Sequence, residues 1–123
     1  MIKKLLPLLL LILIGCSNTI EEVEEKDGLY YIQNTDTLYS GYWKKYYPNG
    51  EVEVEGNFKE GKKDGYWFYY YDDGSKQREL DYKDGKRFGK SLFYFPGFGQ
   101  VMYKEYHDID GNLILTQRLG EDF

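Results

Sequence analysis

The chain contains 123 residues, and its 21 acidic and 16 basic side chains give a formal net charge of −5 at pH 7. That length allows one ordinary domain. The acidic balance argues against nucleic-acid binding, which depends on Lys and Arg to neutralise phosphates. Because the sequence holds a single cysteine, no internal disulfide can form, and packing has to supply the stability.

The N-terminal segment, residues 1–15, has the layout of an export signal. Lys3 and Lys4 precede an apolar run over residues 5–14, and the small residue Gly15 follows it. The run is too short to span a bilayer, which takes about 20 apolar residues. We therefore predict that residues 1–15 are a signal peptide that is removed from the mature protein.

Cys16 directly follows Leu13-Ile14-Gly15, and this short sequence resembles the lipobox of bacterial lipoproteins. The resemblance implies that Cys16 receives a diacylglycerol, becomes the new amino terminus and anchors the chain to a membrane. Ser17 is similar to the residue that follows the cysteine in lipoproteins sorted to the outer membrane of Gram-negative bacteria. We expect a lipid-anchored protein of the bacterial cell envelope, in the outer membrane.

The segment after the cysteine is acidic. Residues 17–27 carry five acids and no aromatic side chain, a composition typical of a solvated segment rather than of one that enters a core. The sequence therefore predicts a tether over residues 16–27, which includes the lipidated cysteine, and a folded domain over residues 28–123.

From Gly28 onward the sequence repeats with period 24, and a repeat of this length indicates a stack of similar structural units. Gly-Tyr-Trp at residues 41–43 recurs at 65–67, and residues 57–62 match residues 81–86 position by position. The third unit is degraded, since Ser91 stands where Trp43 and Trp67 predict a third tryptophan.

Each unit has the pattern of a β-hairpin. Residues 51–55 alternate charged and apolar side chains, and residues 65–71 are rich in aromatic residues that favour strands. Asn49-Gly50 and Asp73-Gly74 predict tight hairpin turns with positive φ at both central residues. Residues 59–64 and 83–88 form the longer connections. The expected fold is all-β, an antiparallel meander or elongated single sheet of hairpins. An inserted residue near Gly97 prevents us from assigning faces over residues 100–107.

The repeated pattern G-Y-W-x-x-Y-Y-x-[ND]-G, followed by [FY]-K-[ED]-G-K, resembles the MORN-repeat variant of bacterial proteins in the YwqK antitoxin-like family. The resemblance covers residues 41–98. It implies an elongated all-β stack of hairpins without a cofactor or a known active site. The family name implies a toxin as partner, usually in the cytoplasm, whereas the lipobox at Cys16 predicts a location outside it.

Aromatic side chains are the most prominent chemical feature. Strand alternation places Trp67, Tyr69 and Tyr71 on one face, with Trp43 and Tyr47 stacked one repeat away. These residues form either the core, since large aromatics dominate burial, or an exposed platform for a glycan or a partner protein. The opposite face, with Tyr66, Phe68 and Tyr70, is also aromatic.

The connecting turns repeat a basic cluster. Lys62 and Lys63 in one turn correspond to Lys86 and Arg87 in the next, so a regular stack would align them along one edge. Such an edge could meet anionic lipid headgroups. The alternative is a set of solvated turns of mixed charge, because acidic residues lie among these cations.

The sequence offers no catalytic or metal-binding set. A calcium loop that began at Asp108 would need Gly at its sixth position and Glu at its twelfth, whereas Gly111 is fourth and Leu119 is twelfth, so a plain hairpin turn is expected over residues 108–112. His107 is the only histidine, and one histidine without cysteines cannot assemble a zinc site. We expect neither an enzyme nor a cofactor.

These observations lead to one functional hypothesis with three alternatives. The hypothesis is a protein-binding or scaffolding module held at the cell envelope. The first two alternatives are a carbohydrate binder and a lipid-surface binder, and either would require Trp43 and Trp67 to be exposed on one face. The third is an immunity-like protein that neutralises a toxin, as the family resemblance implies.

Overall fold

A computed structural model describes residues 22–97 and 99–119. Strands are the only regular elements in those ranges. They are β1 Val23–Lys26, β2 Leu29–Ile32, β3 Gly41–Tyr46, β4 Val52–Lys59, β5 Lys62–Tyr70, β6 Lys76–Lys83, β7 Lys86–Arg87, β8 Gly89–Tyr94, β9 Val101–His107 and β10 Leu113–Arg118. Within the same ranges the structure contains no helix that could cross a membrane.

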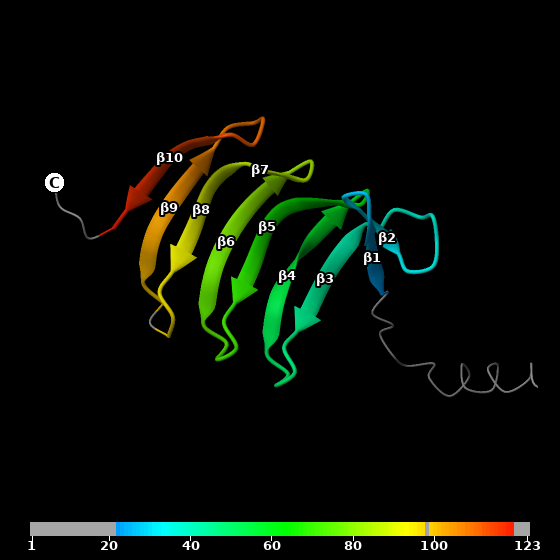
Figure 1. Ribbon diagram of the computed structural model, residues 1–123, viewed down its shortest axis with the longest axis horizontal. Coiled ribbons are helices and arrows are strands. Elements are labelled where there is room, and N and C mark those ends of the chain that lie inside the picture. The colour runs from blue at the N-terminus through cyan, green and yellow to red at the C-terminus, as the bar shows by residue number, and fades with distance from the viewer. Residues whose placement is uncertain (1–21, 98, 120–123) are drawn as a thin grey trace, which may run out of the picture.

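Most of the strands form one antiparallel sheet, the main sheet. Its order is β10-β9-β8-β6-β5-β4-β3, with the short strand β7 paired to β6. Strands that follow one another in the sequence therefore lie side by side, as Figure 1 shows across the whole sheet. The predicted all-β class and antiparallel hairpin meander are confirmed.

The tightest turns lie where the sequence predicted longer connections. Two-residue turns with positive φ at both positions join three pairs of strands, and this conformation matches the twist of the strands that they connect. The turns are Asp27-Gly28 (52° and 78°), Glu60-Gly61 (49° and 76°) and Asp84-Gly85 (50° and 79°). The prediction of long connections over residues 59–64 and 83–88 is wrong, because the strands continue up to each pair.

The predicted conformation of Asn49 and Asp73 is also wrong. Only Gly50 and Gly74 have positive φ in these turns. The Tyr47 amide donates to the Glu51 carbonyl at 2.8 Å, which leaves a loop of three residues. Asn49 Oδ1 accepts a bond from the Glu51 amide at 3.0 Å. This side-chain bond stabilises the three-residue loop in place of the two-residue loop of a type I′ turn. The adjoining ladder contains a register shift between Lys45 and Tyr46.

Folded structure begins earlier than the sequence predicted. β1 lies inside the predicted tether and pairs with β2, so the prediction for residues 16–27 is wrong for Val23–Lys26. The physical reason is that Val23 packs against the core, while Glu24 turns outward and pairs with Lys26 at 3.1 Å. The predicted signal peptide and Cys16 lie outside the described residues.

The core lies on one face of the main sheet, near β3, β4 and β5. Its buried members are Tyr39, Val54, Phe58 and Trp67. Phe58 is the centre of the cluster, since its ring lies 4.4 Å from that of Tyr30 and 4.8 Å from that of Trp67. Tyr30 belongs to β2, so the β1–β2 hairpin supplies the second layer of this core.

The described strand pairs and core contacts all fall within residues 22–119. A chain of residues 17–123 therefore keeps every one of them. It also lacks the only cysteine of the sequence, Cys16, which simplifies cross-linking. This chain, called the soluble domain below, is suited to solution experiments.

Candidate functional site

The two faces of the main sheet carry different chemistry. The Trp67 face is the one that holds the core; Trp67 is fully buried and lies opposite Leu80 on β6. The Tyr66 face is the reverse side, where Tyr66 is 63% exposed. In the described ranges the only structure outside the main sheet is the β1–β2 hairpin with its connection, and this hairpin packs on the Trp67 face. The Tyr66 face is therefore the open face. Its central members are Tyr42, Glu55, Tyr66, Phe68, Tyr70 and Glu79.

One carboxylate orders the part of the Tyr66 face near β3. The Tyr42 hydroxyl donates to Glu55 Oε2 at 2.6 Å, and the Tyr70 hydroxyl donates to Glu55 Oε1 at 2.8 Å. Lys44 Nζ lies 3.4 Å from Glu55 Oε2. Burial pushes the pKa of Glu55 upward, but these hydrogen bonds and the lysine outweigh it and hold the pKa below its usual value. Burial and the bond to Glu55 together raise the pKa of Tyr70. Both tyrosine rings are thus held in fixed orientations.

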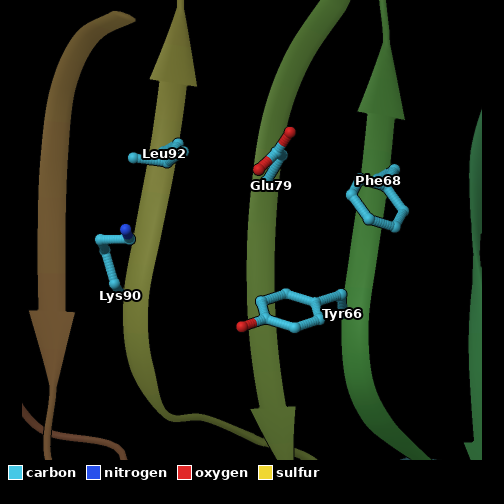
Figure 2. Close-up of a pocket in the computed structure, with 5 residues that line it drawn as sticks. All are labelled: Tyr66, Phe68, Glu79, Lys90 and Leu92. Atoms are coloured by element: carbon cyan, nitrogen blue, oxygen red, sulfur yellow. The ribbon is translucent and has the colours of Figure 1, made fainter.

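A shallow hollow of about 250 Å³ lies at the centre of the Tyr66 face. Figure 2 shows its lining, with Tyr66 and Phe68 on β5, Glu79 on β6, and Lys90 and Leu92 on β8. The rings of Tyr66 and Phe68 are stacked, with centroids 6.4 Å apart. The hollow therefore combines aromatic surface with a carboxylate and an ammonium group.

Glu79 is held from two sides. Lys76 Nζ donates to Glu79 Oε1 at 2.5 Å, and burial together with a hydrogen bond to Glu79 raises the pKa of Tyr94 to about 12. Lys90, in contrast, has no ion pair among the described residues. The hollow thus presents a positioned acceptor beside an exposed, unpaired ammonium group.

The predicted tryptophan platform is buried at its centre, where it forms part of the core. Trp67 is 0% exposed, and its ring N–H donates to the Asn57 carbonyl at 3.0 Å. Trp43 is half-buried, with its ring centroid 6.1 Å from that of Trp67. Tyr69 shares this face, where its hydroxyl accepts a bond from Lys63 at 2.9 Å. The carbohydrate hypothesis required both tryptophans to be exposed, and Trp67 does not meet that requirement.

The other two predicted binding tyrosines connect successive hairpins. The Tyr47 hydroxyl donates to the Tyr70 carbonyl at 2.6 Å, and the Tyr71 hydroxyl donates to the Tyr94 carbonyl at 3.1 Å. Each bond joins the end of one hairpin to the strand that follows 23 residues later. Their hydroxyl groups are engaged with the protein's own backbone, which indicates a structural role.

The predicted basic edge is divided between two places. Lys62 and Lys86 are exposed beside the tight turns. Lys63 instead lies over the ring of Trp67 at 4.8 Å, and Arg87 lies over the ring of Phe93 at 5.5 Å. Only half of the predicted set is therefore available at an edge.

The C-terminal part of the Trp67 face, the polar end, buries polar side chains beside the stacked rings of Phe93 and Tyr103. Arg87 Nη2 donates to Glu105 Oε2 at 2.6 Å, and Ser91 lies opposite Glu105 on the neighbouring strand. Ser91 is 0% exposed and His107 is 8% exposed, yet Ser91 Oγ and His107 Nδ1 have no hydrogen-bond partner in the described protein. Burial, and secondarily the charge of Arg87, lower the pKa of His107.

Sequence reasoning missed the Tyr66 face as a candidate surface. Alternation in β5 correctly placed Tyr66, Phe68 and Tyr70 together, opposite Trp67 and Tyr69. Both faces are aromatic, however, so composition gave no reason to prefer one. The missing signal is the β1–β2 hairpin, which covers only the Trp67 face and whose first strand, β1, lies inside the predicted tether.

The described residues contain no group of three or more His, Cys, Asp or Glu side chains placed to hold a metal ion. Comparison of the chain with family models, with curated proteins and with solved structures finds no match. The resemblance to the MORN-repeat variant accordingly stays a prediction from the repeated motifs.

Proposed function

We propose that this protein is a lipid-anchored module of the bacterial cell envelope that binds another protein, and that the Tyr66 face is its contact surface. The observation that carries the proposal is the 63% exposure of Tyr66 in β5, a central strand of the main sheet. Tyr42, on the same face, is 51% exposed, and contiguous exposed apolar patches mark interaction sites.

The ordering of the tyrosines supports a protein ligand. Tyrosine is enriched at the energetic centres of protein interfaces because its ring provides contact area and its hydroxyl a hydrogen bond. Glu55 already fixes the hydroxyls of Tyr42 and Tyr70. Side chains that are ordered before binding lose less conformational entropy when the complex forms. The face is therefore prepared for contact in the free protein.

Photocross-linking in cells tests this proposal. A benzoylphenylalanine in place of Tyr66 should give a discrete adduct on irradiation, because the ring at this position would lie inside the interface. The matched control carries the same group in place of Ile109, which is 55% exposed in a turn outside the Tyr66 face. The adduct should weaken when Tyr42→Ala is added to the Tyr66 probe.

The cross-linking experiment has clear contrary results. Identical adducts from the probes at residues 66 and 109 would indicate random collision rather than a binding face. No discrete adduct from residue 66, in membranes where the protein is abundant, would also count against a protein partner at this surface.

A glycan ligand is a second candidate, and the hollow between Tyr66, Glu79 and Lys90 favours it. Sugar rings stack on aromatic side chains, and their hydroxyls donate to carboxylates. Titrating oligomers of N-acetylglucosamine into the soluble domain should then shift the NMR signals of Tyr66 and Leu92 and leave those of Trp67 unchanged. The absence of shifts at millimolar sugar would remove this candidate.

A further inference from the structure

One row of side chains crosses the Tyr66 face at the level of the hollow. Each member lies directly opposite the next on the neighbouring strand, and in order they are Lys44, Glu55, Phe68, Glu79, Leu92, Lys104 and Gln117. Neighbouring strands lie about 4.8 Å apart, so successive members of the row are in reach of one another. The row passes through the hollow at Phe68, Glu79 and Leu92 (Figure 2).

Both carboxylates of this row are already paired with lysines of the same chain. Lys44 Nζ lies 3.4 Å from Glu55 Oε2, and Lys76 Nζ donates to Glu79 Oε1 at 2.5 Å. A basic group of a partner would have to compete with these lysines. The β3–β6 part of the row therefore offers no strong attraction to a cation.

The lysines on the other side of the hollow have no such partners. Lys90 lines the hollow, and Lys104 lies opposite Leu92 on β9. Neither lysine forms an ion pair with a described residue. The only acidic residue of β8, β9 and β10 is Glu105, which lies on the Trp67 face and pairs with Arg87. These three strands thus give the Tyr66 face two uncompensated positive charges.

We propose that the Tyr66 face recognises a protein segment in which an acidic residue stands beside an apolar one. The apolar side chain packs in the hollow against the ring of Tyr66 and against Leu92. The carboxylate pairs with Lys90 and Lys104. This inference rests on the proposed function, because it names the chemistry of the partner that binds there.

An extended partner segment has a suitable spacing for these contacts. Alternate residues of an extended chain point to the same side and lie about 6.6 Å apart. Lys90 and Leu92 are likewise two residues apart in β8 and lie on the same face. A carboxylate and an apolar side chain two residues apart would therefore meet the ammonium group and the hollow together. Burial of the apolar side chain supplies affinity, and the opposite charges supply specificity.

Charge reversal in cells that carry the benzoylphenylalanine probe at residue 66 tests the inference. Lys90→Glu and Lys104→Glu should each lower the yield of the adduct by about tenfold or more, because like charges then meet at the interface. Lys90→Arg should retain the adduct, since it keeps the charge. Lys26→Glu is the matched control, because it changes the net charge equally but lies in the β1–β2 hairpin on the Trp67 face. Circular dichroism of each soluble domain establishes that it is folded.

Mass spectrometry of the adduct identifies the partner segment that contacts the hollow. This segment should contain Asp or Glu within two residues of an apolar side chain. Replacing that acid by Lys should remove the adduct with the unmodified protein and restore it with Lys90→Glu, because reversal of both charges recreates an attractive pair. A misfolded variant could not be rescued in this way.

The contrary results are distinct from one another. An adduct that persists in Lys90→Glu and Lys104→Glu, or a partner segment without an acid, would overturn the inference and leave partner binding at the Tyr66 face in place. Equal loss in Lys26→Glu would reduce the effect to net charge. Sedimentation of the soluble domain with phosphatidylglycerol vesicles that is lost in Lys90→Glu would assign the lysines to lipid headgroups instead. No adduct from the unmodified protein would overturn the proposed function and this inference together.

Discussion

The two ends of the Trp67 face bury different kinds of side chain. Trp43 and Trp67 hold equivalent positions in successive repeats and contribute to a core that the β1–β2 hairpin covers, whereas the same position of the next repeat holds Ser91. Phe58 in β4 belongs to the aromatic core, and His107 occupies the corresponding position in β9. Burial alone therefore does not require an apolar residue. A tightly packed aromatic core forms where a second layer is present.

Cationic side chains also cover aromatic rings on this face. Lys63 lies 4.8 Å from the ring centroid of Trp67 and 5.2 Å from that of Tyr82. Arg78 lies 4.1 Å from the ring centroid of Tyr69. Long charged side chains can shield aromatic surface with their methylene stems and attract the rings through cation–π interactions. A sheet of one layer can thus keep its aromatic face out of water over part of its area.

The largest expected effect belongs to the covered end. Trp67→Ala removes a fully buried ring and should lower the free energy of unfolding by about 3–5 kcal/mol. Urea unfolding of the soluble domain, followed by circular dichroism, measures the loss. Tyr66→Ala is the control at the neighbouring position and should change stability by no more than about 0.5 kcal/mol, because Tyr66 is exposed. Equal losses in both variants would contradict the assignment of the two faces.

A smaller effect, of opposite sign, is expected at the polar end. Ser91→Ala removes a buried hydroxyl that has no hydrogen-bond partner in the described protein, so stability should be unchanged or rise by up to about 1 kcal/mol. Ser75→Ala provides the contrast, since Ser75 Oγ donates to Asp73 Oδ1 at 2.6 Å. Its loss should cost about 0.5–1 kcal/mol in the same urea experiment. A large loss at Ser91 would mean that this end packs as tightly as the other.

The strands of this protein could be predicted from the sequence more accurately than its turns. The antiparallel meander followed from the alternation and the repeated turns, and the faces of β5 followed from period two. The turns were misassigned because the Asn and Asp that precede Gly50 and Gly74 form side-chain bonds with the backbone, which favour a three-residue loop. Glu60 takes positive φ without being a typical residue for it, whereas Asp84 precedes Gly85 in an Asp-Gly pair, which favours this conformation.

The open face could not be predicted for a different reason. Its identity depends on where β1 and β2 pack, and the acidic composition of residues 17–27 concealed Val23, an apolar residue that packs against the core. The Glu55 and Glu79 clusters on that face depend on pairing between strands. Tyr42, for example, is 13 residues from Glu55 in sequence. No local pattern in the sequence reports such contacts.

The smallest expected effect is a pH dependence at the polar end. The pKa of His107 is lowered from its ordinary 6.5, so the unfolded chain binds a proton more readily than the folded one. The contribution of His107 to stability is therefore present above pH 6.5 and is lost as the pH falls below it. Urea midpoints at about pH 7.5 and 5.5 should fall more for the unmodified domain than for His107→Gln, which carries no titrating group there. Equal falls would mean that burial and the charge of Arg87 do not lower the pKa of His107 against the opposing charges of Glu105 and Asp108.

The bonds from Tyr47 and Tyr71 to the next hairpin have an evolutionary consequence. Each tyrosine reaches a backbone carbonyl, a group that every residue type supplies. A duplicated repeat would therefore find its attachment point already in place, whatever side chains it carried. Each duplication would widen the sheet by two strands, or about 9–10 Å, and lengthen the Tyr66 face without disturbing either end. Gene duplication could thus adjust the reach of this protein in steps of one hairpin.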